Sequence, residues 1–518
     1  MKIIKKMILK NFKKFRSLEV CFDKRMNVFI GDNETGKSTI LSALDFVLSG
    51  SKSKVEKIGV ESLFNVDVIK EFLGGDRKIE NLPEIIIDVY LSEQNNPDLN
   101  GKNNISQEVS DGLRLHCLPL TDFHPQIRSA LSSGDDNFPF EYYAIKFLTF
   151  SAEPYGGFRK YLKHLMIDSS QVNNEYATRE YVRDIYALTA KNEEKYKLKN
   201  EYRQSRRDFV AKSLEALNSR LDKQKLGLRY GDRHGVEADL IITENEIPIE
   251  SMGKGRQSFI KTEFALNKKN ESEIDVILLE EPENHLSYIN MKKLINRISI
   301  TDKQLFVATH SSLIVSRLGL NFVQVMPESG NPVRLQSLTK DTYEFFIKVP
   351  DSNILEFLLA PKLILVEGSA EYILMGAMYK RITGSEIDDS GVHVISVNGL
   401  SFKRYLEIGK LLGKKIAVIR DNDGNYDENC VQNYADYSSN SIKIFSDTDN
   451  NKMTFEICFY QSNSSLCDEV FKSGRRKLTV QSHMLSNKAD AALEILLKKG
   501  NEIQTPVYIK EAIEWIKN

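Results

Sequence analysis

The sequence predicts an α/β protein in which short buried strands alternate with helices and end in polar residues. The first observation is an apolar run at Val28–Ile30, which leads into a glycine-rich loop and then into helical spacing from Ser38 to Leu48. The second is a pair of apolar strands after residue 350, each followed by carboxylates. At 518 residues the chain is too long for one hydrophobic core, so about two to four domains are expected.

Composition places the chain among ordinary globular proteins. Hydrophobic residues make up 41% and charged residues 28%, and the net charge of -1 argues against a generally basic nucleic-acid coat. The five cysteines form no C-x-x-C pair, which is typical of free thiols in a reducing compartment. No apolar run approaches the roughly 18 residues of a membrane span, and the basic N-terminus lacks the core of a signal peptide. We therefore expect a cytoplasmic protein without a membrane partner.

The glycine-rich loop has the pattern that cradles phosphates. Residues 31–39 read GDNETGKST and fit G-x-x-x-x-G-K-[ST]. Gly31 and Gly36 let backbone N–H groups surround an anion, and the following helix adds the positive end of its dipole. Lys37 is expected to reach the β- and γ-phosphates, and the Ser38 hydroxyl to ligate Mg²⁺. A nucleotide, ATP, is the ligand that this loop predicts.

The first 40 residues resemble the opening of the ABC-type ATPases that include the chromosome-maintenance and Rad50-like proteins. In those proteins a short hairpin precedes GxNxxGKST, and this chain has KNFKKF at the expected turn. The resemblance assigns nucleotide contacts to Gly31, Asn33, Gly36, Lys37, Ser38 and Thr39. The hairpin lysines could contact DNA phosphates or could simply protect an edge strand by their charge.

A helical insertion is predicted between residues 158 and 227. This stretch contains no proline and, up to Leu226, no glycine, and its apolar residues recur at helical intervals. It is far too short for the long coiled-coil arm of Rad50-like proteins. We expect a dimerisation or lid element of two or three helices, with a purely structural hairpin as the alternative.

Three later stretches are expected to complete the nucleotide site. Residues 251–257, SMGKGRQ, open a helix and resemble the signature loop of ABC-type ATPases, which closes over the γ-phosphate held by a partner subunit. That resemblance implies contacts from Ser251, Gly253 and Gly255. Taken alone, the match is weak, and an ordinary glycine-rich loop is the default interpretation.

The second stretch, residues 274–286 (IDVILLEEPENHL), is a buried strand that ends in Glu280 and Glu281. One carboxylate is expected to hold the Mg²⁺ water shell and the other to orient the attacking water, with Glu281 as the base. ABC-type ATPases usually have Asp and then Glu here, so the departure leaves the division of labour open. The third stretch, LFVATHSS, ends a strand at His310, which resembles the histidine that senses the γ-phosphate. A lone histidine is otherwise more often structural.

A second group of carboxylates follows residue 350. KLILVEGSAE places Glu367 at a strand end and Glu371 about one helical turn later, and KIAVIRDND delivers Asp421 and Asp423. The two aspartates are expected to share one face, because strand side chains alternate. Carboxylates at the carboxyl ends of neighbouring parallel strands converge, and divalent cations relieve their repulsion. The pattern predicts a Mg²⁺ or Mn²⁺ site suited to phosphodiester chemistry, against the alternative of solvated strand-end acids.

This E-G-x-x-E and D-x-D pair resembles the TOPRIM domain of topoisomerases, primases and some nucleases. The order of phosphate loop, helical insertion, EEPENHL and TOPRIM motifs resembles the OLD (overcoming lysogenization defect) family of ATP-dependent nucleases. The resemblance implies that Glu456 is a further metal ligand and that Lys488 stabilises the transition-state phosphate. Both of these matches are short, and ordinary surface positions are the alternative.

The resemblance implies a four-part chain: an ABC-type (SMC/Rad50-like) ATPase in two parts, 1–157 and 228–349, the insertion 158–227, and a Rossmann-like TOPRIM nuclease domain, 350–518. The implied function is ATP-gated, metal-dependent cleavage of phage or plasmid DNA by a homodimer in bacterial defence. The implied partners are a retron reverse transcriptase or a Gabija-type helicase-like subunit. An RNA-cleaving effector, an ATPase that only senses nucleotide and a Rad50-like tether without nuclease activity remain as alternatives. The basic clusters 206–207 and 475–477 could line a DNA path or be solvated charge.

Overall fold

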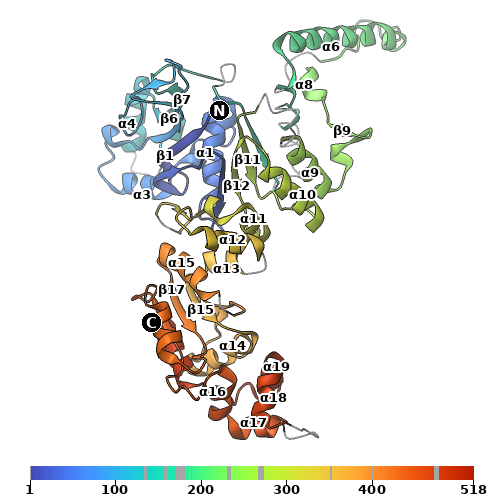
Figure 1. The fold of residues 1–518 in the computed structure, drawn as a ribbon. Coiled ribbons are helices and arrows are strands. Elements are labelled where there is room, and N and C mark those ends of the chain that lie inside the picture. The colour runs from blue at the N-terminus through green and yellow to red at the C-terminus, as the bar shows by residue number, and fades with distance from the viewer. Residues whose placement is uncertain are drawn as a thin grey trace. The chain divides into compact units, whose positions relative to one another are not determined.

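The computed structural model divides the chain into two compact units, which are described separately (Figure 1). The first unit contains Met1–His310 and Met326–Pro332, and the second contains Ser311–Val325 and Val333–Asn518. The structure describes residues 2–132, 137–156, 161–169, 181–183, 185–187, 189–229, 235–265, 274–328, 330–349, 353–399, 401–471 and 478–517. No helix within these ranges is both long and apolar enough to cross a membrane.

An antiparallel sheet opens the first unit. It contains β1 (Ile4–Phe12), β2 (Phe15–Cys21), β4 (Ile85–Leu91), β6 (Ser110–Pro119) and β7 (Tyr143–Thr149), with the short β5 (Asn100–Gly101) beside β6. Neighbouring strands run β2-β1-β4-β6-β7. The expected N-terminal hairpin is therefore present, with its turn at Lys13 and Lys14 between β1 and β2.

A parallel sheet carries the phosphate loop. Four neighbouring strands of it are parallel: β3 (Met26–Ile30), β12 (Gln304–Ala308), β11 (Val276–Glu280) and β8 (His164–Asp168), in that order across the sheet. Their apolar residues are buried almost without interruption, as expected for strands covered on both faces. Helix α1 (Lys37–Ser49) packs against both sheets, so one core joins them. All four strands end at the same edge, and residues at that edge come together.

Strand β8 is a correction to the helical interpretation of residues 158–227. The run HLMID contains only three apolar residues, but it pairs in register with all five residues of β11. Tertiary pairing thus overrides the absence of glycine and proline. Its first residue, His164, contacts the buried Asp45 of α1 at 2.9 Å, and Lys54 Nζ lies 2.9 Å from the same carboxylate.

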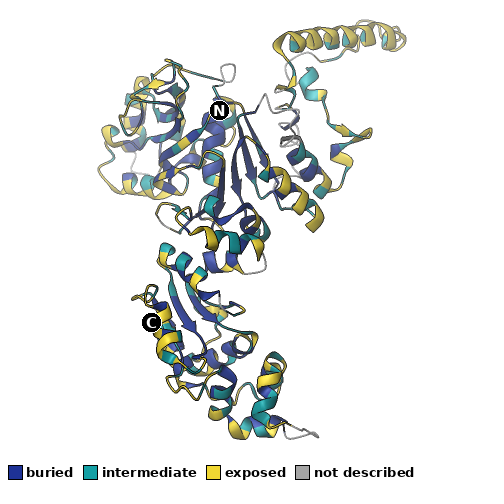
Figure 2. Cartoon of the chain, viewed as in Figure 1, coloured by how far each residue is buried: buried dark blue, intermediate teal, exposed yellow. Residues whose placement is uncertain are grey.

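Helices do occupy other parts of the 158–227 stretch. Helix α6 (Asn192–Ser213) is followed by the short α7 (Glu215–Asn218), and neither helix buries any residue (Figure 2). Their function in dimerisation stays a prediction. Further along, α9 (Lys254–Ala265) and α10 (Tyr288–Ser299) contact each other near β8 and β11.

The second unit is built on a four-stranded parallel sheet. The strand order is β16 (Val392–Ser396), β15 (Lys362–Val366), β17 (Lys415–Ile419) and β18 (Ile442–Phe445). The main helices around it are α14 (Ser369–Thr383), α15 (Phe402–Leu412), α16 (Phe455–Ser462), α17 (Ser464–Phe471), α18 (Val480–Ser486), α19 (Lys488–Lys499) and α20 (Val507–Lys517). A continuous apolar core joins this sheet to α14, α16, α19 and α20. The predicted α/β class, with two parallel sheets, is confirmed.

Helices that precede residue 350 also belong to the second unit. They are α11 (Ser312–Leu318) and α12 (Lys340–Lys348), with α13 (Ile354–Leu359) following. Phe346 of α12 packs edge-on against Tyr405 of α15, and Glu407 of α15 accepts hydrogen bonds from the start of α12. The domain limits inferred from the sequence stay predictions.

Candidate functional site

The phosphate loop joins β3 to α1, and its glycines are required by close packing. Gly36 caps α1 with φ +100°, and a Cβ atom there would lie 2.3 Å from Cζ of Phe15. A Cβ atom on Gly31 would lie 2.5 Å from Oγ1 of Thr35. The N-terminal hairpin therefore packs the ring of Phe15, the first residue of β2, onto the loop, and only glycine is tolerated at position 36.

Lys37 is folded onto the loop it belongs to. Its Nζ donates to the carbonyl oxygens of Gly31 at 2.8 Å and Asp32 at 2.9 Å. Burial lowers the pKa of Lys37, although the nearby Glu281 opposes this effect. Of the other predicted contacts, Asn33 and Ser38 are exposed and Thr39 is half-buried. An incoming phosphate could take over the lysine donors that the carbonyl oxygens now accept.

Glu280 ends β11 and faces the start of α1. The hydroxyl of Ser38 hydrogen-bonds to its carboxylate, and burial raises the pKa of Glu280. Asp168, at the end of β8, pairs in register with Glu280, and its charge raises that pKa further. Sequence reasoning missed Asp168, because β8 was not recognised as a strand. Ser38, Glu280 and Asp168 together supply hard oxygen atoms of the kind that suits Mg²⁺.

Glu281 lies in a turn next to a second carboxylate. Its φ is 45°, and its N–H donates to the carbonyl of Ala308 at 2.9 Å. Burial, and then the charge of Glu283, raise the pKa of Glu281 to about 8. His310 Nε2 lies 3.4 Å from Glu281 Oε1, and burial lowers the pKa of His310. At neutral pH the pair is therefore a protonated carboxyl beside a neutral imidazole.

Glu283 was not singled out from the sequence, yet it holds this part of the site. Its Oε1 accepts from the Thr309 hydroxyl at 2.6 Å and from the His310 N–H at 2.8 Å. The carboxylate thereby fixes the backbone of the histidine after β12. The third acid of EEPE was the available signal, but spacing alone does not show which strand it faces.

The loop resembling an ABC signature lies at the surface of the unit. Ser251 and Gly253 are exposed, and a Cβ atom on Gly253 would meet nothing within 4 Å. Gly255 differs, because a Cβ atom there would lie 2.2 Å from the carbonyl oxygen of His285. The loop is thus seated against the segment that follows Glu281, and its use by a second chain stays a prediction.

The second group of acids lies at the carboxyl edge of the other parallel sheet. Glu367 follows β15 and Asp421 lies just beyond β17, the neighbouring strand. Glu371 is in the first turn of α14 and Glu456 in the first turn of α16. These four residues are called the acid cluster below, and Lys488, the first residue of α19, lies beside it.

Electrostatic coupling shows that the acid cluster is one site. Burial, and then the charges of its three other members, raise the pKa of Asp421 to about 8. Burial also raises the pKa of Glu371, to about 7, although a hydrogen bond from its own backbone opposes this rise. The pKa of Glu367 is raised by burial. Carboxyl groups whose pKa is raised in this way can exchange protons for a cation.

The alternation rule predicted that Asp421 and Asp423 share one face of a strand, but neither residue lies in a strand. Strand β17 ends at Ile419, so the D-x-D motif lies in a turn, and Asp423 has φ 50°. Its Oδ2 accepts from Nη2 of Arg420 at 3.0 Å, whereas Asp421 accepts from the N–H of Phe455 at 2.7 Å. The two carboxylates therefore have different partners, and Arg420, absent from the sequence-based assignment, pairs with that of Asp423.

The acid cluster fits a divalent metal by its chemistry. All its donors are carboxylate oxygens, and Oε2 of the buried Glu456 makes no hydrogen bond, although Lys488 Nζ lies 3.1 Å away. Within the described ranges, no three His, Cys, Asp or Glu side chains already converge on a common metal position. Mg²⁺ commonly takes one or two protein carboxylates and completes its shell with water and substrate phosphate. The cluster can supply such a partial shell.

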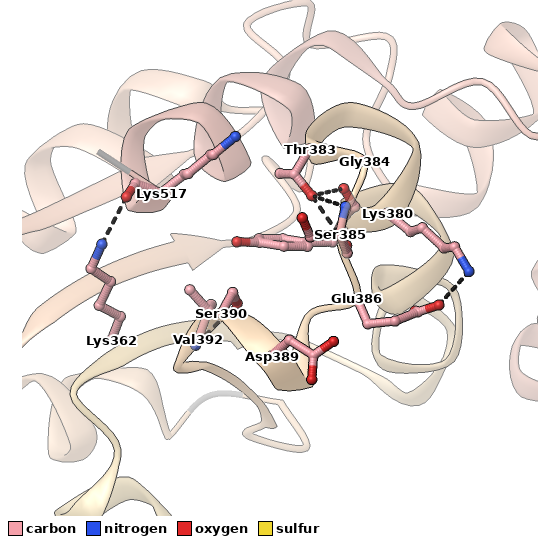
Figure 3. Close-up of a pocket in the computed structure, with 11 residues that line it drawn as sticks. Lys362, Lys380, Thr383, Gly384, Ser385, Glu386, Asp389, Ser390, Val392 and Lys517 are labelled. Carbon is pink, nitrogen blue, oxygen red and sulfur yellow. Dashed lines mark hydrogen bonds and ion pairs between the residues drawn. The ribbon is translucent and has the colours of Figure 1, made fainter.

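A cavity of about 610 Å³ lies at the opposite, amino end of the same sheet (Figure 3). Lys362 at the start of β15 donates to the carbonyl of Lys517, and Lys380 pairs with Glu386. Two of its lysines are thus held by neighbouring groups, and the cavity contains none of the predicted site residues. Of the basic clusters, 475–477 lies outside the described residues, and Arg206 on α6 donates to the carbonyl of Arg229 at 2.7 Å.

Comparison with protein families identifies two parts of the chain. Residues 1–225 match the AAA ATPase domain model, and residues 358–423 match the model for the TOPRIM domain of overcoming lysogenization defect-like proteins. The first match contains the phosphate loop, and the second contains Glu367, Glu371, Asp421 and Asp423. The predicted recognition of an ATPase joined to a TOPRIM domain is confirmed.

Similar proteins cover parts of the chain. The Old nuclease of Escherichia phage P2 is 27% identical over 177 residues, which are 32% of this chain and 30% of that protein. The DNA replication and repair protein RecF of Clostridium kluyveri is 32% identical over 84 residues, 15% of this chain and 22% of that protein. The chain thus spans less than a third of the length of these relatives.

Among solved structures, the C-terminal region of the Burkholderia pseudomallei OLD protein is 18% identical, with a TM-score of 0.26. It covers 30% of this chain and 97% of its own. The SMC head domain from Thermotoga maritima is 13% identical, with a TM-score of 0.29, and covers 64% of this chain and 99% of its own.

Proposed function

This chain joins an AAA ATPase domain to an OLD-like TOPRIM domain, and we propose that ATP controls a metal-dependent cut in DNA made by the second domain. The observation that carries the proposal is the acid cluster, in which four carboxyl groups and a lysine meet at the carboxyl edge of a parallel sheet. A structural role does not require three buried acids and a half-buried fourth whose charges repel one another.

A divalent ion bound there would polarise the scissile phosphate and generate the attacking hydroxide. Glu371, Asp421 and Glu456 would hold it, because their carboxylates are buried and mutually coupled. The Lys488 side chain is 52% exposed, so its ammonium can leave Glu456 and donate to a non-bridging phosphate oxygen. Glu367, just after β15, adds a further carboxylate to the site and accepts a hydrogen bond from the N–H of Asp421 at 3.3 Å.

In the ATPase domain, Lys37 and the loop N–H groups would bind the phosphates of ATP, and Ser38 and Glu280 would hold the accompanying Mg²⁺. Glu281 would orient water, and His310 beside it would report the γ-phosphate. Ser251, Gly253 and Gly255 would close over the nucleotide of a second copy. The active ATPase is then a head-to-tail homodimer in which each chain lends its signature loop.

The nuclease half of the proposal is tested by Glu371→Gln. This variant removes one buried carboxylate without changing the side-chain volume, and Asp389→Asn, on the rim of the opposite cavity, is the matched control. Plasmid and single-stranded DNA are incubated with Mg²⁺ or Mn²⁺ and ATP. We expect Glu371→Gln to cut at least about 100-fold more slowly, and Asp389→Asn to cut at the wild-type rate. Equal cleavage by both variants contradicts the assignment.

Control by ATP is tested with Lys37→Ala. The variant keeps the acid cluster, so Mn²⁺ binding is unchanged while cleavage no longer responds to ATP. The direction of the change separates two versions of the proposal: cleavage lost means that ATP drives the cut, and cleavage gained means that ATP restrains it. Cleavage that still responds to ATP as the wild type does contradicts both. A variant of Glu281 that loses hydrolysis but keeps ATP-dependent cleavage favours a nucleotide sensor.

Two competing functions have clear signatures in the same assays. A Rad50-like tether leaves DNA uncut with either metal, although DNA still stimulates ATP hydrolysis. An RNA-cleaving effector degrades tRNA in preference to DNA when the two are digested side by side. We assign DNA as the substrate because the similar Old protein of phage P2 is named a nuclease and the RecF relatives are named for DNA replication and repair.

We also propose a function in defence against phage, on the resemblance to the OLD family. Phage would then form fewer plaques on cells that carry the chain, and Glu371→Gln would remove the protection. A reverse transcriptase or helicase-like gene beside this one would identify the partner. Undiminished plaque numbers with the chain and its neighbouring genes together contradict this function and leave the biochemical assignment untouched.

A further inference from the structure

A buried arginine lies inside the acidic site of the TOPRIM domain. Arg420 immediately follows β17 and precedes Asp421, and its side chain is only 6% exposed. Burying a guanidinium is unfavourable unless its charge and its N–H groups are paired. The contacts of this arginine therefore indicate what it is there to hold.

Arg420 connects the two aspartates of the D-x-D motif. Its Nε donates to the main-chain carbonyl of Asp421 at 3.0 Å, and its Nη2 donates to Oδ2 of Asp423, also at 3.0 Å. One planar group thus fixes the backbone of the first aspartate and the carboxylate of the second. Lysine cannot reproduce this, because its ammonium is a single point of charge without a planar fork.

Arg420 is itself held in place. Its Nη1 donates to the hydroxyl of Tyr434 at 2.8 Å, and the guanidinium carbon lies 5.5 Å from the centre of the same ring. Tyr434 is 3% exposed, and Phe402 of α15 packs edge-on against it. The arginine is therefore a fixed cation, in contrast to the half-exposed Lys488.

The turn that carries Asp423 is held from its other side as well. Asn422 is buried, and its Nδ2 donates to the carbonyls of Asp447 at 2.7 Å and Asp449 at 3.0 Å in the loop after β18. The N–H of Asp423 donates to the carbonyl of Met453 at 3.2 Å. A left-handed aspartate costs roughly 1 kcal/mol or more, so these bonds indicate a conformation that the site requires.

We propose that Arg420 is the positioning residue for Asp423, and that it presents this carboxylate to the metal on the Glu367 side of the acid cluster. The site then has two halves that meet at Asp421. Arg420 balances Glu367 and Asp423, and Lys488 balances Glu371 and Glu456. The inference rests on the proposed function for the identity of the site, and it concerns metal binding, which can be measured without any cleavage.

The test is Mn²⁺ binding to the full chain, measured by titration calorimetry and by the electron paramagnetic resonance signal of free Mn²⁺. The variants are Arg420→Lys, Asp423→Asn and the double variant, with Asp389→Asn as the control. We expect Arg420→Lys to weaken Mn²⁺ affinity about 10- to 100-fold, as loss of a partner that orients a ligand does. In the Asp423→Asn background the same change should weaken affinity less than about twofold, because Arg420 acts through Asp423.

Tyr434→Phe provides a milder second variant, because it removes one hydrogen bond and keeps the ring. It should weaken Mn²⁺ affinity by less than Arg420→Lys and leave the thermal midpoint near that of the wild type. Arg420→Lys with wild-type affinity overturns the proposal. So does an equal loss in the wild-type and Asp423→Asn backgrounds, which would indicate general support of the fold. If the wild type binds Mn²⁺ in this pattern yet cuts no nucleic acid, the positioning stands and the proposed nuclease function fails.

Discussion

Alanine at Gly36 tests how the N-terminal hairpin shapes the phosphate loop. The new Cβ atom would lie 2.3 Å from Cζ and 2.6 Å from Cε2 of Phe15, whereas carbon atoms in contact stand about 3.5 Å apart. The ring or the loop would have to move by about 1.2 Å. Overpacking of this kind costs roughly 1–3 kcal/mol, and φ +100° adds about 1–2 kcal/mol for a residue with a side chain.

We therefore expect Gly36→Ala to destabilise the first unit by about 2–5 kcal/mol. At roughly 2 °C per kcal/mol for a unit of this size, its thermal midpoint falls by about 4–10 °C. Calorimetry measures the midpoint, and ATP identifies the transition by shifting it in the wild type. Gly74→Ala is the control, because a Cβ atom at the end of α3 (Val66–Gly74) meets nothing within 4 Å.

The steric part of the cost is isolated by a second change, Phe15→Leu. A smaller side chain leaves room for the new methyl group, so the two substitutions together should cost about 1–3 kcal/mol less than the sum of their separate effects. The backbone part remains in the double variant. Strict additivity, or a Gly36→Ala protein as stable as Gly74→Ala, would refute the claim that the ring of Phe15 sets the shape of this loop.

Three further predictions follow from the acids. Glu281, with a pKa of about 8, can act as the base only in its ionised fraction, and Glu281→Gln removes that carboxylate without changing the side-chain volume; the variant should bind a fluorescent ATP analogue normally while phosphate release slows by about 10²–10⁴-fold, and slowing of less than tenfold contradicts the assignment as the base. The partners Lys54 and His164 outweigh burial and lower the pKa of Asp45 to about 2 from 3.8, so this group stabilises the fold above pH 3.8. About 2 kcal/mol is lost as pH falls through 2, and the acid-induced drop in the thermal midpoint should be smaller in Asp45→Asn. Glu371 and Asp421, with pKa values of about 7 and 8, must both lose a proton to bind metal, so Mn²⁺ affinity should rise by about 10- to 100-fold per pH unit from 6 to 7; a flat profile contradicts this.

Sequence reasoning located most strand-end residues because buried parallel strands leave a plain pattern. An apolar run followed by glycine or by a charged residue marked Gly31, Glu280 and Glu367. The same rule failed for β8, where five residues carry too little pattern to stand out from their helical surroundings. Asp168 was lost with it. Strand β8 forms because it pairs with β11, which lies more than a hundred residues away in the chain.

The D-x-D motif shows a different limit. Alternation along a strand placed Asp421 and Asp423 on one face, but the strand ends before either of them. The turn beyond it is set by a local bond from Arg420 to Asp423 and by bonds from Asn422 to the loop after β18, and the latter join residues that are distant in the sequence. Residue types predicted the chemistry of the site, while the orientation of each carboxylate depends on partners that only folding brings near.

The missing side chain of Gly255 has a consequence for communication between two chains. Because Gly255 of α9 lies against the carbonyl of His285, the loop offered to a neighbour is in direct contact with the segment that follows Glu281. In the proposed dimer, the state of a chain's own nucleotide is thereby transmitted to the pocket of the other. The two nucleotide sites of that dimer would then be coupled in both directions, and the enzyme would hydrolyse two ATP molecules together or none.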